Sequence, residues 1–271
     1  MIAPAKVNLL LHVAPPRADG YHPLCSLFAS IDLADEVVVE PAAADEVRCP
    51  GVEGPNLAER ALAAYREAAG AAAPGPVRVT ITKRIPVAAG LGGGSADAAA
   101  VLRALDALAE RPLGPDRLRE IGARLGADVP SQVEPRHALV TGVGEHVEPV
   151  ALPPMALVLV PQREGLPTAA VYAEADRIGA TRSELDPDAV RALARAPLPE
   201  LARGLENDLQ AAALSLRPEL ERPLEALREA GALAALVTGS GPTTFGVFAT
   251  VEEAERAAAR IPGALVSTLR A

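Results

Sequence analysis

The chain has 271 residues, of which 49% are hydrophobic and 23% are charged, and its formal net charge is −9. This composition predicts a globular protein with a sizeable core, in one large domain or two smaller ones. The acidic balance argues against nucleic acid as a partner, because that binding requires clustered Lys and Arg. No apolar run is long enough to span a membrane. Two cysteines, Cys25 and Cys49, are too few for a disulfide framework, so we expect a reduced, cytoplasmic protein.

The first predicted strand, residues 6–13, alternates between two faces: Lys6, Asn8, Leu10 and His12 share one, and Val7, Leu9, Leu11 and Val13 share the other. A solvent-facing strand whose lysine extends into water is an alternative interpretation. Asp19-Gly20 then predicts a hairpin turn. Residues 24–31 and 36–40 are expected to form two further strands, and residues 56–69 a helix.

A glycine-rich segment, residues 86–96, separates a predicted strand at 77–83 from a predicted helix at 95–109; we call it the first glycine loop. Glycines let a ligand approach the backbone, and the free N–H groups of a helix N-terminus attract anions, so the loop predicts a phosphate or nucleotide site. A turn that serves packing alone is the alternative. No Lys-Ser/Thr follows the last glycine, so the loop is not a Walker A motif. Ser95 is expected as the helix N-cap, and Asp97 in the first turn would repel a nearby phosphate unless a cation intervenes.

A short helix is predicted at 116–125, followed by Asp128, which could be no more than the N-cap of the next helix. Residues 138–140 should form a strand before a glycine turn at 142–144. The pair Pro153-Pro154 is the candidate boundary between two α+β domains, residues 1–152 and 153–271.

The second half alternates strands and helices. The sequence predicts strands at 157–160, 233–237, 244–248 and 264–269, and helices from residue 168, near 200–214, near 218–230 and from residue 251. Without the inserted helices the order is β-α-β-β-α-β, which is typical of a ferredoxin-like unit. The second glycine loop, residues 238–242, lies between two of these strands, so each domain is expected to contribute a glycine loop to a shared cleft.

Aromatic residues are scarce, with three Tyr, three Phe and no Trp. Tyr21 nevertheless lies beside a predicted turn, where burial is least assured. This position favours a ring that stacks on a base or packs on a ligand, and an ordinary amphipathic contact is the alternative.

Three segments, residues 4–9, 86–98 and 237–241, resemble in sequence and order the three motifs of the GHMP superfamily of small-molecule kinases. Within it, residues 18–22, 90–97 and 126–130 are similar to the family of kinases that act on 4-diphosphocytidyl-2-C-methyl-D-erythritol. The resemblance extends from about residue 3 to about residue 248. The residues after Pro130, among them Ser131 and Gln132 and residues 135–137, depart from the family pattern, so the wall beside Asp128 is not predicted.

The resemblance implies an α+β fold: a ribosomal-protein-S5-like domain with the ATP loop and catalytic residues, then a ferredoxin-like domain with inserted helices. It implies transfer of the ATP γ-phosphoryl group to the 2-hydroxyl of 4-diphosphocytidyl-2-C-methyl-D-erythritol, in the non-mevalonate isoprenoid pathway. ATP and Mg²⁺ are the implied cofactors, and a monomer or homodimer without nucleic-acid or membrane partners is expected. A homoserine- or mevalonate-type kinase, or a catalytically silent nucleotide-binding protein, remains an alternative.

Carried over by position, the resemblance makes Lys6 and Asp128 the catalytic pair. It makes Tyr21 and Tyr172 the two rings that hold the cytosine, and His22 the residue that reads the base edge. Asn8 and Thr168 match polar contacts to the substrate. It assigns the ATP phosphates to Pro86, Val87, Ala88, Ala89, Gly90, Leu91, Gly92, Gly93, Gly94, Ser95 and Ala96. No metal ligand is assigned, and Ser95 is the nearest candidate for a Mg²⁺ contact.

Overall fold

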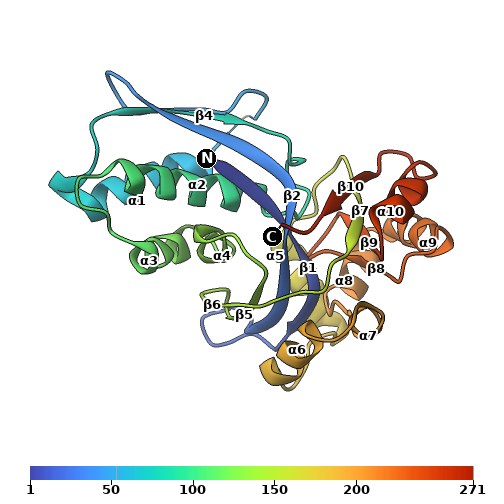
Figure 1. Ribbon diagram of the computed structural model, residues 1–271. Helices are drawn as coiled ribbons and strands as arrows, with labels where there is room; N and C mark the ends of the chain where they lie inside the picture. Colours follow the sequence, from blue (N-terminus) through green and yellow to red (C-terminus); the bar gives the residue numbers. More distant parts are fainter. Residues whose placement is uncertain (53, 271) are drawn as a thin grey trace.

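The computed structural model describes residues 1–52 and 54–270 and contains two β-sheets that meet near the middle of the molecule (Figure 1). The first sheet has the order β3-β4-β2-β5-β6, and β1 pairs with β2 as well. Its strands are β1 (Ile2–Val13), β2 (Leu24–Pro41), β3 (Glu46–Arg48), β4 (Val77–Thr82), β5 (Ala138–Gly142) and β6 (His146–Pro149). Its helices are α1 (Leu57–Ala69), α2 (Gly93–Leu108), α3 (Pro115–Leu125) and α4 (Val129–Val133). In Figure 1, α1 and α2 lie beneath β2 and β4.

The second sheet is antiparallel with the order β10-β7-β9-β8, so the predicted ferredoxin-like unit is confirmed. Its strands are β7 (Ala156–Val160), β8 (Ala234–Val237), β9 (Thr244–Phe248) and β10 (Leu265–Thr268). The helices of this half are α5 (Thr168–Ile178), α6 (Pro187–Ala194), α7 (Leu198–Arg203), α8 (Gln210–Leu216), α9 (Glu221–Glu229) and α10 (Val251–Ala258). No helix in the described ranges is long and apolar enough to cross a membrane.

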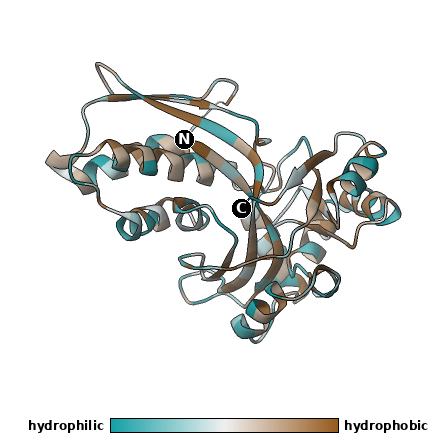
Figure 2. Ribbon diagram, viewed as in Figure 1, coloured by the Kyte–Doolittle hydropathy of each residue, from teal (hydrophilic) through white to brown (hydrophobic). Residues whose placement is uncertain are grey.

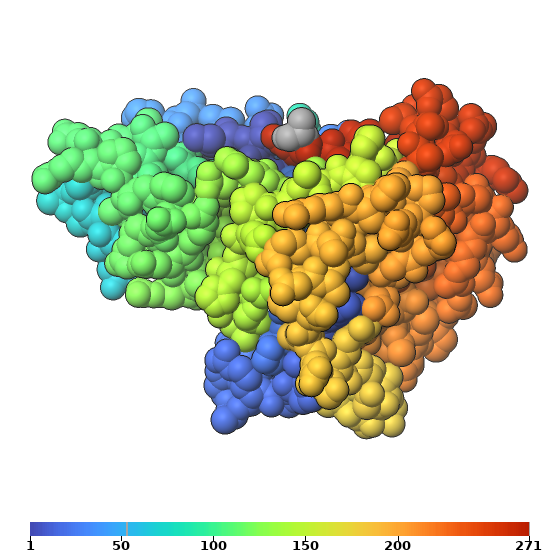
Figure 3. All heavy atoms as spheres, turned by 60° about the horizontal axis from the view of Figure 1, so that its bottom comes forward, coloured from blue at the N-terminus to red at the C-terminus, as the bar shows by residue number. Residues whose placement is uncertain are grey.

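One hydrophobic core joins the two sheets. Val7 and Leu9 of β1 pack in the same buried cluster as Leu157 of β7 and Phe245 of β9. Hydrophobic residues follow the strands where the sheets meet, and the outer helices carry hydrophilic ones (Figure 2). In Figure 3 the atoms of α6 lie against those of β5 and β6, and Arg191 of α6 pairs with Glu148 of β6. The predicted boundary at 152/153 falls between β6 and β7 and stays a prediction.

The two strands predicted at 24–31 and 36–40 are one strand, β2. The prediction failed because Asp32 and Asp35 interrupt the apolar pattern. Both carboxylates have donors: Asp32 accepts from the N–H of Thr268 at 3.1 Å, and Asp35 from the N–H groups of Arg84 and Ile85. The strand therefore continues through both residues.

The regular alternation predicted for β1 is also wrong beyond Asn8. A register shift between Asn8 and Leu10 moves each of the following side chains to the opposite face of the strand from the one predicted. As a result Leu10 joins the core between the sheets, whereas Leu11 faces the same cavity as Lys6 and Asn8.

The helix predicted near 200–214 is two helices, α7 and α8, and α6 was not predicted. The chain between α7 and α8 runs along the outer edge of β1 instead. The N–H of Leu11 donates to the Glu206 carbonyl at 2.9 Å, and the N–H of Asp208 donates to the Leu11 carbonyl at 2.9 Å. These bonds satisfy edge groups of β1 that would otherwise be unpaired.

Because the core is shared, truncating one side chain in it should destabilise both sheets together. We expect Phe245→Ala to lower the free energy of unfolding by about 3–5 kcal/mol, since the ring is fully buried, and unfolding to remain a single transition. Chemical denaturation followed by circular dichroism measures both quantities. Leu108→Ala, at a residue 53% exposed, is the control and should cost less than about 0.5 kcal/mol. Two separated transitions, of which only one moves, would contradict the shared core.

Candidate active site

The Lys6 side chain is buried, with 7% of its surface exposed, and its ammonium is surrounded by three groups. Nζ donates to Oδ1 of Asn8 at 2.6 Å, lies 3.2 Å from Oδ2 of Asp128 and sits 4.7 Å from the centroid of the Phe28 ring. A carboxylate, an amide oxygen and an aromatic face together compensate for the water that the ammonium has lost. The interpretation of Lys6 as a solvent-facing lysine is therefore wrong.

Asn8 is fixed by its own partners. Its side-chain amide donates to Oγ of Ser26 at 2.9 Å, which turns Oδ1 toward Lys6. Its backbone N–H donates to Oγ1 of Thr238 at 2.9 Å. Thr238 begins the second glycine loop, so a single residue of β1 connects the buried ammonium to the second half of the chain.

Asp128 occupies the N-cap position of α4, but its side chain makes no capping hydrogen bond. The carboxylate instead faces Lys6, and 32% of the side chain is exposed to the cavity. The local structure is held by other means, since Oγ of Ser131 donates to the Asp128 carbonyl at 2.8 Å. The capping interpretation therefore explains the position of the residue but not the direction of its carboxylate.

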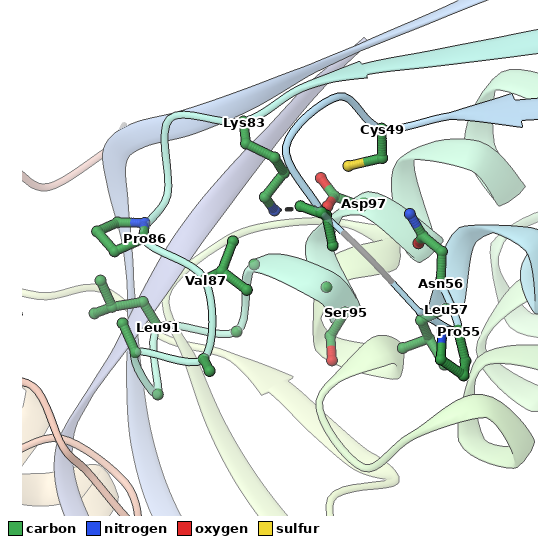
Figure 4. A pocket seen from close by; sticks show the side chains of 17 residues that line it. Cys49, Pro55, Asn56, Leu57, Lys83, Pro86, Val87, Leu91, Ser95 and Asp97 are labelled. Atoms are coloured by element: carbon green, nitrogen blue, oxygen red, sulfur yellow. Dashed lines mark hydrogen bonds and ion pairs between the residues drawn. The ribbon is translucent and has the colours of Figure 1, made fainter. Parts of the chain in front are cut away.

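Helix α2 begins two residues earlier than predicted, so two expectations about the first glycine loop are corrected. The N-cap is Gly92, whose φ of 71° is in the left-handed region, and not Ser95, which lies within the first turn. Asp97 lies beyond the first turn and is buried against Lys83 (Figure 4). A left-handed glycine turns the chain into the helix without a side-chain cap, which leaves the Ser95 hydroxyl free to face a ligand.

The two glycine loops contact each other and Lys6. A Cβ on Gly90 would lie 2.5 Å from the carbonyl oxygen of Gly241, and a Cβ on Gly92 would lie 3.0 Å from Cγ of Lys6. The N–H of Thr243 donates to the carbonyl of Ala89 at 3.3 Å. These glycines are needed for the close approach of backbone to backbone and of backbone to lysine.

Two cavities meet at the first glycine loop. The first, of about 350 Å³, has residues 86–92 as one wall and Pro55, Asn56 and Leu57 as the opposite wall (Figure 4). The second, of about 260 Å³, is lined by side chains that include Lys6, Asn8, Asp128, Thr168, Tyr172 and Ser240. Gly90, Gly92 and Ser95 line both cavities, so ligands in the two would meet at these residues.

The structure brings most of the predicted acceptor-side residues together. Oγ1 of Thr168 lies 3.0 Å from Oγ of Ser240. The rings of Tyr172 and His22 are 4.9 Å apart between centroids and tilted by 49°. Burial, and to a lesser extent the charge of Asp128, raises the pKa of Tyr172 to about 12, so the phenol stays neutral. Tyr21 is 63% exposed and is not among the residues that line the cavity.

Asn207 is a residue of the site that the sequence did not reveal. Its buried side-chain amide donates to the carbonyls of Val237 and Gly239 at 2.7 and 2.8 Å, and its Oδ1 accepts from the N–H of Leu209 at 2.9 Å. It thereby holds the second glycine loop, in which Gly239 lies against Asn8. The residue fell within a predicted helix, and no local pattern distinguishes it.

Comparison with known proteins identifies the family. Residues 56–134 match the GHMP kinases N terminal domain, and residues 189–266 match the GHMP kinases C terminal domain. A 4-diphosphocytidyl-2-C-methyl-D-erythritol kinase from Kineococcus radiotolerans is 46% identical over 89% of this chain and 78% of its own. The chain belongs to this kinase family.

Solved structures agree. A crystal structure of 4-(cytidine 5'-diphospho)-2C-methyl-D-erythritol kinase is 41% identical, with a TM-score of 0.82 over 100% of this chain and 99% of its own. A homoserine kinase from Cytophaga hutchinsonii reaches a TM-score of 0.70 over 99% of this chain and 93% of its own at 18% identity, which shows the shared fold alone. The GHMP fold expected from the sequence is confirmed, and the chain is an ATP-dependent phosphotransferase of this kinase family.

Substituting Gly90 should separate the two glycine loops. In Gly90→Ala the new methyl group meets a backbone carbonyl, and the φ of 79° costs a further ~1–2 kcal/mol, so we expect kcat/KM for ATP to fall at least about tenfold. Steady-state kinetics with varied ATP measures this. Gly75→Ala is the control, since nothing lies within 4 Å of its Cβ and it lines neither cavity, and it should stay within about twofold of wild type. Equal effects of the two substitutions would contradict the role of the loop contact.

Proposed function

We propose that the enzyme transfers the γ-phosphoryl group of ATP to the 2-hydroxyl of 4-diphosphocytidyl-2-C-methyl-D-erythritol, as a step of the non-mevalonate isoprenoid pathway. The observation that carries the proposal is the position of the Lys6–Asp128 pair. Both residues line the second cavity, and this cavity meets the first at Gly90, Gly92 and Ser95. A phosphoryl group delivered there would lie beside a buried ammonium and a partly exposed carboxylate.

ATP fits the first cavity by the chemistry of its lining. The N-terminus of the 16-residue helix α2 supplies free N–H groups and the positive end of the helix dipole, so phosphates would be bound by the backbone and not by a basic patch. This explains how a chain with a net charge of −9 can hold an anionic nucleotide.

Mg²⁺ would enter with ATP. The described residues hold no cluster of three or more His, Cys, Asp or Glu side chains suited to a metal ion. Mg²⁺ bound to a nucleotide takes most of its ligands from phosphate and water, so a single protein oxygen can suffice. The hydroxyl of Ser95, a residue that lines both cavities, would be that ligand. When bound, the ion would neutralise part of the phosphate charge.

The chemical step assigns a role to each member of the pair. Asp128 accepts the proton of the 2-hydroxyl as the new O–P bond forms and the bond from the γ-phosphorus to the bridging oxygen breaks, which releases ADP. Lys6 supplies fixed positive charge where negative charge develops on the transferred group. Asn8 holds the ammonium in place through the 2.6 Å hydrogen bond.

The cytosine would be held between Tyr172, which lines the second cavity, and Tyr21, which lies outside that lining. The exposed ring of Tyr21 is available for stacking. Nδ1 of His22 donates to the Ala14 carbonyl at 2.9 Å, and Nε2 lies 3.4 Å from Oδ2 of Asp176. Within the described residues the backbone N–H and C=O of His22 have no hydrogen-bond partner. We therefore assign the reading of the base edge to these backbone groups, which match the donor and acceptors of cytosine.

The two alternative functions suggested by the sequence are disfavoured. The family assignment argues against a homoserine- or mevalonate-type kinase, and a catalytically silent binding protein would not need a buried lysine paired with a partly exposed carboxylate. We place the enzyme in the cytoplasm, in keeping with two cysteines that are both free thiols. A monomer or homodimer stays a prediction.

The deciding experiment measures ADP release by purified protein with ATP, Mg²⁺ and one acceptor at a time. We expect turnover with 4-diphosphocytidyl-2-C-methyl-D-erythritol and none with homoserine or mevalonate. Turnover with either of the latter, and none with the cytidyl compound, would replace the proposal with a sister kinase.

Asp128→Asn should remove the proton acceptor and leave the fold intact. We expect kcat to fall by about 10²–10⁴-fold, the usual contribution of a general base, and the melting temperature to fall as well, because the buried Lys6 ammonium loses a charged partner. Asp116→Asn is the matched control, because that side chain is 95% exposed on α3 and lines neither cavity. Wild-type turnover in Asp128→Asn would exclude the residue as the base.

Tyr172 should contribute binding through its ring. Tyr172→Ala should raise KM for the cytidyl substrate by about 5–150-fold, which corresponds to a stacking energy of ~1–3 kcal/mol per base, and leave KM for ATP within about twofold. Tyr172→Phe keeps the ring and should behave as wild type in both assays. If Phe and Ala variants are equally impaired, the hydroxyl and not the ring carries the contact.

A further inference from the structure

A buried cluster of three charged residues lies behind the first glycine loop. Asp35 of β2 is fully buried, and its Oδ1 accepts from the backbone N–H groups of Arg84 and Ile85 at 2.6 and 2.8 Å. Its Oδ2 accepts from Nζ of Lys83 at 2.5 Å. These donors are the last three residues before the loop begins at residue 86, so one carboxylate fixes the start of the loop.

The same ammonium reaches the other end of the loop. Nζ of Lys83 donates to Oδ2 of Asp97 at 2.7 Å, and Asp97 belongs to α2, into which the loop leads. Figure 4 shows the Lys83 and Asp97 side chains pointing toward one another beside the nucleotide cavity. A Cβ on Gly93 would lie 3.2 Å from Nζ, so the absence of a side chain there leaves room for the ammonium.

The charges make this contact stronger than a surface ion pair. Burial lowers the pKa of Lys83, but the hydrogen bonds to Asp35 and Asp97 raise it by more, so the ammonium stays charged. Burial raises the pKa of Asp97, and Lys83 offsets only part of that rise. Two carboxylates thus share one ammonium out of water, where losing one partner is costly.

We propose that Lys83, held by Asp35 and Asp97, is a clasp that fixes both ends of the first glycine loop, and that Asp35 and Asp97 are positioning residues for phosphoryl transfer. The inference rests on the proposed function for its kinetic consequence. The loop carries Gly90 and Gly92, at which the two cavities meet, and a displacement of about 1 Å there can cost about 100-fold in rate. The clasp acts through the backbone of the loop and does not touch the acceptor.

The test compares Asp97→Ala, Asp97→Asn and Asp106→Ala. Asp106 is the matched control, because it is a buried aspartate of the same helix that accepts from the Tyr65 hydroxyl and from the N–H groups of Leu113 and Gly114, away from the loop. Two readouts are needed: amide hydrogen exchange of residues 84–92, and steady-state kinetics with ATP and the cytidyl substrate varied in turn.

The clasp predicts that Asp97→Ala speeds exchange of residues 84–92 at least about tenfold and lowers kcat/KM for ATP by about 10–100-fold, with KM for the cytidyl substrate within about twofold of wild type. Asp97→Asn keeps an oxygen for Lys83 and should recover most of both losses. Asp106→Ala should change neither readout, although it lowers the melting temperature.

The proposal is overturned if Asp97→Ala and Asp106→Ala give the same exchange and the same ATP kinetics, because the effect would then be general destabilisation. A wild-type enzyme that fails to phosphorylate the cytidyl substrate contradicts the proposed function alone. The exchange comparison requires no turnover and still decides whether the clasp exists.

Discussion

The removal of one lysine ammonium from water is the constraint on which the site depends. An ammonium buried without partners is prohibitively unfavourable, so every element around Lys6 contributes something that compensates. The lysine's own strand supplies the Asn8 amide, and the neighbouring strand β2 supplies the Phe28 ring. The turn before α4 supplies the Asp128 carboxylate, and the first glycine loop packs its backbone on the lysine stem. The geometry that stabilises the charge in the free protein also places it where a phosphoryl group would be transferred.

β1 makes this arrangement possible because its two edges serve different purposes. One edge pairs with β2. The other is closed by three separate segments: the carbonyl of Leu91, the chain at 206–208 and the hydroxyl of Thr238. The two glycine loops are therefore attached to the strand that carries Lys6. The core between the sheets fixes the position of each loop relative to the other. A site built from distant parts of the chain needs this kind of common support.

Much of this could be predicted from the sequence, and the failures share a physical cause. Periodicity located most strands and helices, and the glycines marked both loops. The sequence could not reveal that β2 continues through Asp32 and Asp35, or that β1 changes face after Asn8, because both depend on partners that are distant in the chain. Ser95 was a good N-cap by residue type, yet Gly92 turned the chain into the helix first.

The candidate site, like the fold, could be predicted from the sequence only in part. The resemblance to a kinase family placed Lys6 and Asp128 in one site, and the structure brings them within 3.2 Å. Asn207 was missed because its contribution is a set of hydrogen bonds to a loop some 30 residues further along the chain. A crystal structure with a non-hydrolysable ATP analogue and the cytidyl substrate bound together would show the arrangement of the reacting groups. We expect the γ-phosphate at Gly92 and Ser95, beside Nζ of Lys6, with the 2-hydroxyl within hydrogen-bond distance of Asp128. A γ-phosphate at the far end of the first cavity, or a hydroxyl directed away from Asp128, would contradict this arrangement.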